Sequence, residues 1–246
     1  MKSRVLLITS FLLVWFTCAH AKDDITKELI TSNGKTRAYY LYVPSTLKPG
    51  SKSPLIIMLH GSGRVGMSLV EKWKDLAKKE GFIIAGPDSA DTRGWNAPND
   101  GPAFLHDLVE ELKTKYPINP RRVYLFGHSA GASFALVMSL AESQYFAATA
   151  IHAGALPPAN SDLMDSAERK IPISIQVGDS DQSVPLKVVR ATRDALNAKG
   201  FAVELTEIPG HDHSYYDLAP KINLKAWEFL KSHELEIDPV YEEFNN

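Results

Sequence analysis

The sequence predicts an α/β fold in which a mostly parallel sheet is covered by helices on both faces. Short apolar runs alternate along the chain with longer stretches in which apolar residues recur at helical spacing. Parallel strands need a crossover connection, usually a helix, and the alternation provides one after most of the strands. With 44% hydrophobic residues in the sequence and no linker or internal repeat, residues 22–246 can bury a core as a single domain.

The chain is expected to open with an antiparallel pair of strands. Residues 25–43 hold two strand-like runs on either side of Asn33-Gly34, which is the strongest short signal for a tight hairpin. Six further strands are expected at residues 55–59, 82–85, 123–126, 147–151, 171–177 and 202–208. Helices are expected at residues 69–79, 103–116, 129–140, 186–199 and 219–233.

The N-terminus has the residue order of a secretory signal peptide. Lys2 and Arg4 precede an apolar run that ends at Phe16, and small alanines follow before Lys22. The run is too short to span a bilayer, and no second apolar stretch of about 20 residues follows it. We therefore expect removal of residues 1–21 and export, to the periplasm or the medium, without stable membrane insertion.

A lipid anchor on Cys18 is the rival interpretation of this N-terminus, although bulky side chains precede Cys18 where small ones are expected. Removal of residues 1–21 takes away this cysteine, the only one in the sequence, so residues 22–246 would rely on their core rather than on disulfides. The formal net charge of −2 becomes −4 when Lys2 and Arg4 are lost, and no basic block remains to bind nucleic acid.

A candidate nucleophile stands where a predicted strand turns into a predicted helix. Gly127-His128-Ser129-Ala130-Gly131 follows the run at 123–126 and begins an apolar helix rich in small residues. The G-x-S-x-G pattern needs this context, because the serine sits on a sharp turn that raises its hydroxyl above the sheet. A serine that only caps the helix is the alternative interpretation. The context favours Ser129 as a nucleophile.

The acid and the base of a serine triad are expected in loops after later strands, in that order. Residues 178–185 offer Asp179 and Asp181, and we assign the acid to Asp181, which lies further from the turn glycine. Residues 210–214 offer His211 and His213. The pair of histidines could suggest a metal site, but no further histidine, cysteine or carboxylate cluster supplies a third ligand. We expect neither a metal nor a cofactor.

Other candidate residues surround the nucleophile in the expected fold. The oxyanion of an acyl intermediate needs backbone donors, and we assign them to Ala130 and to Ser62, which follows the turn His60-Gly61. The long loop at residues 86–101 carries Trp95 and Asn96, which we expect to line the substrate pocket together with His128. Packing roles are the alternative for Trp95 and His128, and a glycine-rich turn without a catalytic role is the alternative at Ser62.

These motifs together resemble a known branch of the α/β-hydrolase fold. Leu59-His60-Gly61, the motif around Ser129, residues 178–185 and the C-terminal histidines are similar to feruloyl esterases and polyhydroxybutyrate depolymerases. Residues 210–216 also resemble the corresponding stretch of S-formylglutathione hydrolases, or esterase D-like proteins, in which the histidine at the position of His213 is catalytic. His211 stands where that family has tyrosine, so it remains the rival base.

The resemblance implies a serine esterase that acts through an acyl-enzyme on short-chain, aromatic or polysaccharide-linked carboxylic esters. A serine peptidase on the same triad and a non-catalytic binding protein on a hydrolase scaffold are the alternatives. Lidded members of this fold insert helices after the strand that follows the nucleophile helix. Residues 154–170 are too few for a large cap domain.

Overall fold

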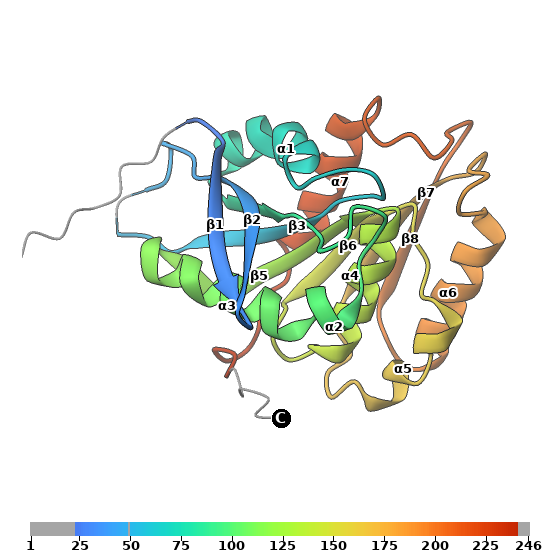
Figure 1. Cartoon of the computed structure of the whole chain (residues 1–246). Coiled ribbons are helices and arrows are strands. Elements are labelled where there is room, and N and C mark those ends of the chain that lie inside the picture. The colour runs from blue at the N-terminus through green and yellow to red at the C-terminus, as the bar shows by residue number, and fades with distance from the viewer. Residues whose placement is uncertain (1–22, 49, 241–246) are drawn as a thin grey trace, which may run out of the picture.

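The computed structural model describes residues 23–48 and 50–240 (Figure 1). One eight-stranded sheet runs through them in the order β1-β2-β4-β3-β5-β6-β7-β8. Its strands are β1 (Thr26–Ser32), β2 (Lys35–Tyr42), β3 (Ser53–Leu59), β4 (Ile83–Pro87), β5 (Ile118–His128), β6 (Ala148–His152), β7 (Ile173–Gly178) and β8 (Val203–Ile208). The predicted signal peptide lies outside the described residues.

The connections between strands are mostly helical. They are α1 (Met67–Glu80), α2 (Ala97–Asp100), α3 (Pro102–Lys115), α4 (Ala130–Ala141), η1 (Pro158–Asn160), α5 (Leu163–Ser166), α6 (Leu186–Ala198) and α7 (Ala219–Leu230). Every predicted helix and strand is present, with ends that differ by up to five residues. Among the described residues no helix has the length and apolar character that crossing a membrane requires.

Strand direction follows the sequence prediction. β3, β4, β5, β6, β7 and β8 pair in parallel, whereas β1 pairs antiparallel with β2, and β2 antiparallel with β4. The hairpin between β1 and β2 turns at Asn33 and Gly34, whose φ angles are +48° and +71°. Both values are positive, as a two-residue turn of the Asn-Gly kind requires. The predicted mostly parallel sheet with an N-terminal antiparallel hairpin is therefore confirmed.

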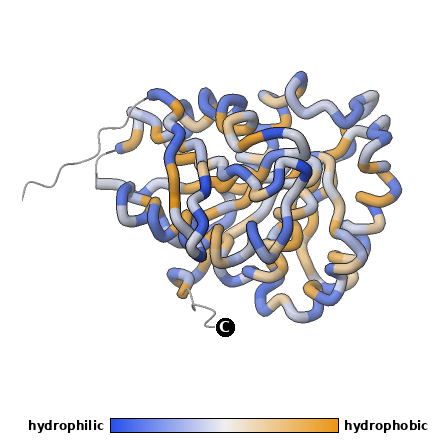
Figure 2. The backbone as a smooth tube through the Cα atoms, in the orientation of Figure 1, coloured by the Kyte–Doolittle hydropathy of each residue, from blue (hydrophilic) through white to orange (hydrophobic). Residues whose placement is uncertain are grey.

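Helices cover both faces of the sheet, and each face has its own core. Successive side chains of a strand point to opposite faces, so β3 sends Leu55 and Ile57 to one core and Ile56 and Met58 to the other. The first core includes apolar residues of α3, α4 and α6, and the second includes those of α1 and α7. Figure 2 shows hydrophobic residues along the central strands and hydrophilic ones along the outer loops.

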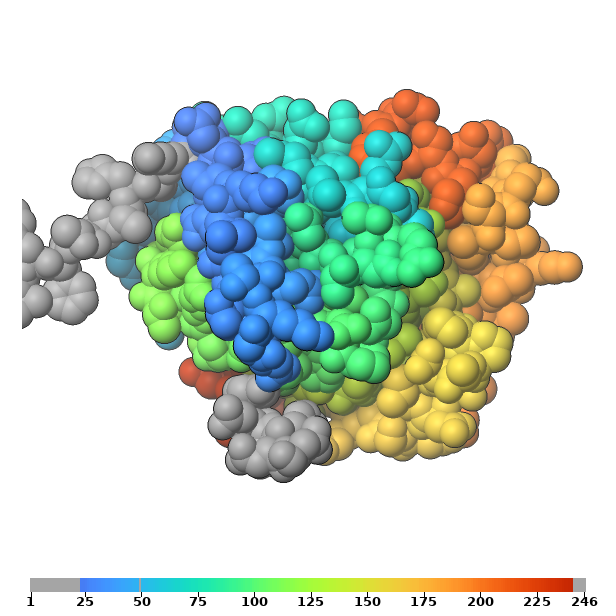
Figure 3. Space-filling view, viewed as in Figure 1, coloured from blue at the N-terminus to red at the C-terminus, as the bar shows by residue number. Residues whose placement is uncertain are grey.

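Two connections contain only short helices: residues 154–170 between β6 and β7, and residues 86–101 between β4 and α3. The stretch at 154–170 holds only the three-residue η1 and the four-residue α5, so the chain has no large cap there, as predicted. The loop at 86–101 contains α2, which the sequence analysis missed. It is fixed to the N-terminal hairpin by an ion pair of 2.6 Å between Arg37 and the fully buried Asp100. Figure 3 shows both segments on the same face of the molecule, 86–101 in green and 154–170 in yellow.

Candidate active site

Ser129 lies on a strained turn between β5 and α4. Its φ and ψ angles are +56° and −119°, a region that residues other than glycine rarely adopt. A Cβ on Gly131 would lie 1.9 Å from the carbonyl oxygen of Leu59, and one on Gly127 would lie 2.3 Å from that of Gly131. Only glycine fits at either position, because strand and helix pass so close together. The two glycines of the motif therefore allow the turn that presents Ser129.

Ser129, His213 and Asp181 are joined in one chain of hydrogen bonds. Nδ1 of His213 lies 2.8 Å from Oδ2 of Asp181, and Nε2 of His213 lies 2.8 Å from Oγ of Ser129. The carboxylate can only accept a hydrogen bond, so Nδ1 carries the proton and Nε2 is free to accept the serine hydroxyl proton. The imidazole is thus held in the tautomer that a general base requires.

The Asp181 carboxylate is fixed on both of its oxygens. Oδ1 accepts the backbone N–H groups of Ser183 and Val184, each at 2.8 Å, while Oδ2 faces His213. The Asp181 side chain is fully buried. A buried carboxylate held by three donors keeps one orientation, and this orientation is passed on to the imidazole ring of His213.

Asp179 and His211, the alternative acid and base, lie outside the hydrogen-bonded chain of Asp181, His213 and Ser129. Oδ1 of Asp179 accepts the backbone N–H of Gly210 at 2.8 Å, so this carboxylate connects the loop after β7 to the loop after β8. The ring of His211 is buried, and its centroid lies 5.5 Å from that of His152. The structure brings His213 to Ser129 and packs His211 against His152. The assignment of catalytic roles to either histidine stays a prediction.

The turn after β3 lies against the nucleophile. A Cβ on Gly61 would be 3.4 Å from the Cβ of Ser129. The ring of His60 holds this turn, because its Nε2 accepts the N–H of Ser89 and its Nδ1 therefore donates to the oxygen of Gly61 at 2.9 Å. Burial lowers the pKa of His60, which keeps the ring neutral in this arrangement.

Trp95 and Asn96 make contacts that the sequence analysis did not anticipate. The indole N–H of Trp95 donates to the backbone oxygen of His60 at 2.8 Å, and its ring stacks on Phe134. The side chain of Asn96 caps α2 by accepting the N–H of Asn99. Neither residue is among those that line the cavity at Ser129. Both instead hold the loop that supports the turn at His60.

A cavity of about 530 Å³ opens beside Ser129. Its lining residues are Gly61, Ser62, Arg64, His128, Ser129, Ser183, His213, Ser214, Tyr215 and Tyr216. They include Ser62 and His128, whose expected roles in the oxyanion site and the substrate pocket stay predictions. The cavity is also lined by Ser183, Ser214, Tyr215 and Tyr216, which lie in the two motif stretches but were given no role of their own. It is lined as well by Arg64, which the sequence analysis missed because an isolated polar residue in a loop carries no periodic signal.

His128 forms one side of a buried aromatic cluster behind the cavity. Its Nδ1 lies 3.1 Å from Nδ1 of His152, and its ring stacks on Tyr215 with the centroids 5.2 Å apart. Burial, and to a smaller extent the electrostatic effect of the neighbouring His213, lower the pKa of His128 to about 4. Burial likewise lowers the pKa of His152. Both rings are neutral at neutral pH.

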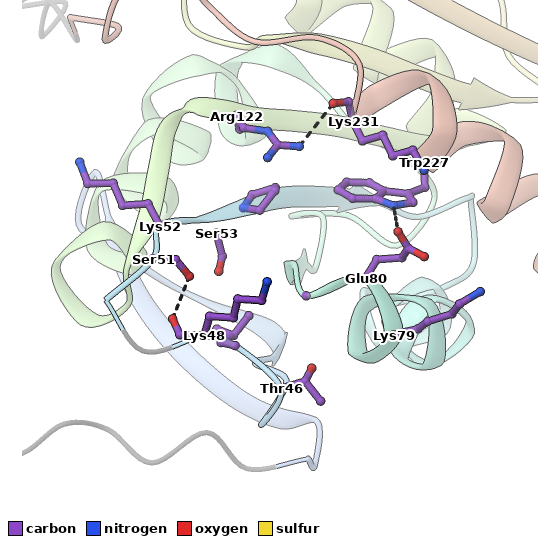
Figure 4. A pocket seen from close by; sticks show the side chains of 13 residues that line it. Thr46, Lys48, Ser51, Lys52, Ser53, Lys79, Glu80, Arg122, Trp227 and Lys231 are labelled. Atoms are coloured by element: carbon purple, nitrogen blue, oxygen red, sulfur yellow. Dashed lines mark hydrogen bonds between the residues drawn. The ribbon is translucent and has the colours of Figure 1, made fainter.

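A second cavity, of about 510 Å³, lies at the opposite edge of the sheet (Figure 4). It is lined by residues before β3, at the end of α1 and at the end of α7. Its polar groups include Lys48, Lys52, Lys79, Arg122 and Lys231, with Glu80 accepting the indole N–H of Trp227. No serine–histidine pair lies there. Within the described ranges no group of three histidine, cysteine or acidic residues is arranged to hold a metal ion.

Comparison with known proteins supports this fold. The sequence is 30% identical over 105 residues to a bifunctional acetylxylan esterase/xylanase of Neocallimastix patriciarum, covering 41% of this chain and 15% of that protein. It is 28% identical over 148 residues to a poly(3-hydroxybutyrate) depolymerase of Ralstonia pickettii, covering 51% of this chain and 30% of that protein. The chain thus spans less than a third of the length of either relative.

A ferulic acid esterase of Anaeromyces mucronatus, whose structure was solved with ferulic acid, has a similar fold. Its TM-score with this chain is 0.67 at 19% identity, covering 85% of this chain and 90% of that chain. The pattern of the phospholipase/carboxylesterase family matches residues 99–223, a stretch that contains Ser129, Asp181 and His213. The chain therefore belongs to the phospholipase/carboxylesterase family and has the α/β-hydrolase fold.

Proposed function

We propose that the protein is an exported serine esterase that hydrolyses carboxylic esters with Ser129 as nucleophile, His213 as base and Asp181 as acid. The observation that carries the proposal is the continuous chain of hydrogen bonds from Asp181 through His213 to Ser129, with both links at 2.8 Å. A nucleophile, its base and an orienting carboxylate in this geometry are what acyl transfer requires. The relatives among esterases and depolymerases support the same class of reaction.

The reaction takes place in two halves. Nε2 of His213 accepts the hydroxyl proton while Oγ of Ser129 attacks the ester carbonyl, and the proton passes to the leaving alcohol as the C–O bond breaks. The acyl group is then bonded to Ser129. In the second half His213 takes a proton from water, the hydroxide attacks the acyl carbonyl, and Ser129 leaves with the proton returned. The Asp181 carboxylate stabilises the imidazolium in both halves.

The oxyanion of each tetrahedral intermediate is stabilised by backbone donors. The N–H of Ala130 stands at the first turn of α4, where a helix leaves its N–H groups without internal partners. The N–H of Ser62 follows Gly61 in the turn next to Ser129. Loss of one such donor typically costs about 10²-fold to 10³-fold in kcat. The helix N-terminus also favours negative charge at this point.

The substrate is a soluble ester or an ester attached to a polysaccharide. Similarity to an acetylxylan esterase and a ferulic acid esterase supports acetyl or feruloyl esters as substrates of this protein. Similarity to a depolymerase supports hydroxybutyrate esters. Residues 22–246 form the catalytic domain after removal of residues 1–21. The shared fold also includes peptidases, so cleavage of an amide bond on the same triad is the second candidate.

A substrate panel tests the proposal. The purified protein is given p-nitrophenyl acetate, methyl ferulate, acetylated xylan, a hydroxybutyrate oligomer and a set of peptide anilides. We expect turnover of at least one ester class that exceeds turnover of every anilide by orders of magnitude. Faster release from an anilide would assign a peptidase, and failure to turn over any of them would assign a binding protein.

A further inference from the structure

Arg64 is a charged residue beside Ser129 that neither the fold nor the proposed triad requires. It lies in the loop between β3 and α1, two residues after Ser62, and it lines the same cavity as Ser129. The loop is fixed on both sides of it. The N–H of Gly63 donates to the oxygen of Thr92 at 2.6 Å, and the N–H of Gly66 donates to Oδ1 of Asp88 at 2.8 Å. The position of the Arg64 backbone is therefore well defined.

The guanidinium group of Arg64 connects two loops of the site. It lies over the ring of Tyr216, with 5.1 Å between its central carbon and the ring centroid. A cation over an aromatic face is held by the ring quadrupole while its N–H donors stay available. Tyr216 is three residues beyond His213, so the positive charge stands between the turn at Ser62 and the loop that carries the base.

This charge is not neutralised by the protein. Within the described part of the chain, Arg64 has no carboxylate within ion-pair distance, and no aspartate or glutamate lines the cavity. The nearby acids of the base loop are used locally, because Asp212 and Asp217 accept the N–H and the hydroxyl of Ser214. Arg190, another exposed arginine, differs from Arg64 because it forms an ion pair of 2.6 Å with Glu207.

We propose that Arg64 forms an anion-binding subsite and that the ester substrates of this protein carry a carboxylate close to the ester bond. The inference rests on the proposed esterase function. One planar guanidinium matches one carboxylate through two parallel hydrogen bonds. Arg64 is the sole lysine or arginine that lines the described cavity, and a phosphate dianion would call for more than one such cation. The substrate class is thus half-esters of dicarboxylic acids, or esters of an acidic sugar or hydroxy acid.

Matched pairs of esters test this subsite. Monomethyl and dimethyl esters of succinate, glutarate and adipate have the same leaving group and differ in one negative charge. The quantity measured is the ratio of kcat/KM for the anionic ester to kcat/KM for the neutral one. We expect Arg64→Gln to lower this ratio by about fivefold or more for at least one chain length. Arg64→Lys should retain part of the preference.

Two controls separate a local contact from a general charge effect. Arg190→Gln removes the same charge from α6 and should leave the ratio of the parent protein unchanged. Added NaCl at about 1 M should lower the ratio in the parent and have little effect in Arg64→Gln, because salt screens an exposed ion pair. Equal ratios in the parent and in Arg64→Gln at every chain length would overturn the subsite while leaving the esterase proposal intact. A parent protein that cleaves no ester, p-nitrophenyl acetate included, would overturn both.

Discussion

The two cavities at opposite edges of the sheet are almost equal in volume but differ in the residues that line them. The cavity beside Ser129 has a volume of about 530 Å³ and the one beside Trp227 about 510 Å³. The first lies beyond the carboxyl ends of β3, β5, β7 and β8. The second lies at the amino ends of β3 and β5, and the charged residues that line it are Lys48, Lys52, Lys79, Glu80, Arg122 and Lys231 (Figure 4). Volume therefore does not distinguish the candidate active site.

The difference arises from where parallel strands end. Each strand of the parallel part of the sheet releases its loop at the same edge, so residues far apart in the sequence meet there. Ser129, Asp181 and His213 follow three different strands and still lie within hydrogen-bond distance. At the other edge the chain returns from helices. Distant segments meet there too, since the indole N–H of Trp227 donates to Glu80 at 3.0 Å, but these contacts join no serine to a histidine. The backbone is also strained at the first edge, where Ser129 and Ala153, which follow β5 and β6, have positive φ angles.

The largest expected effect of a single substitution is at Ser129. Ser129→Ala removes the nucleophile, and we expect the rate of ester hydrolysis to fall by at least about 10³-fold with the fold intact. Lys48→Gln in the opposite cavity is the matched control and should keep the parent rate. Initial rates on p-nitrophenyl acetate, with circular dichroism for folding, measure both. A comparable loss in the two variants would remove the distinction between the cavities.

The two histidines of the base loop should differ almost as strongly. His213→Ala removes the group that contacts both Ser129 and Asp181, so kcat should fall by about 10³-fold or more. His211→Ala leaves a small space beneath the site and should reduce kcat far less. Measurement of kcat for the two variants decides the assignment. If His211→Ala proved to be the inactive one, the base would be the other histidine.

A glycine substitution tests whether the Ser129 edge depends on close backbone packing. A methyl group on Gly131 would lie 1.9 Å from the oxygen of Leu59, so Gly131→Ala should cost about 3 kcal/mol of unfolding free energy or more. A methyl group on Gly94, in the loop at 86–101, would meet no atom within 4 Å, so Gly94→Ala should cost little unfolding free energy. Urea unfolding of both variants provides the comparison. Equal stabilities would contradict the packing described for the turn.

The free energy of unfolding should depend on pH, because the buried His128 has a lowered pKa. Because the pKa of His128 is about 4 in the folded protein and about 6.5 in the unfolded chain, the unfolded chain binds the extra proton first as pH falls. The stability that this group provides is complete above about pH 6.5 and is lost as the pH falls toward 4. Between pH 7 and pH 5 the loss should be on the order of 1 to 2 kcal/mol, and His128→Gln should reduce it. Unfolding free energies of the two proteins at both pH values test this; identical losses would mean that another group titrates.

Much of this molecule could be predicted from local patterns. The hairpin at Asn33 and Gly34, the alternation of strands and helices and the absence of a large cap all depend on residues close together in the sequence. The position of Ser129 could be predicted for the same reason, since its turn is encoded by five consecutive residues. Segment ends were less accurate, because hydrogen bonding in β5 continues to both sides of its apolar run.

Contacts between distant loops could not be predicted in this way. Trp95 was expected to line the pocket, yet its indole N–H donates to the oxygen of His60, 35 residues away in the sequence. Arg64 meets Tyr216 only because β3 and β8 release their loops at the same edge. The burial of Asp100 and its pairing with Arg37 likewise join segments that no local pattern connects.

Covalent labelling of Ser129 tests the central claim most directly. A fluorophosphonate reacts with a serine only where a base removes its proton and an oxyanion site holds the product. Incubation of the parent protein with the reagent, followed by digestion and mass spectrometry, should give one adduct, on the peptide that contains Ser129, and none in Ser129→Ala. A protein that stays unlabelled, or an adduct on any other serine with Ser129 unmodified, would contradict the assignment of this edge of the sheet as the active site.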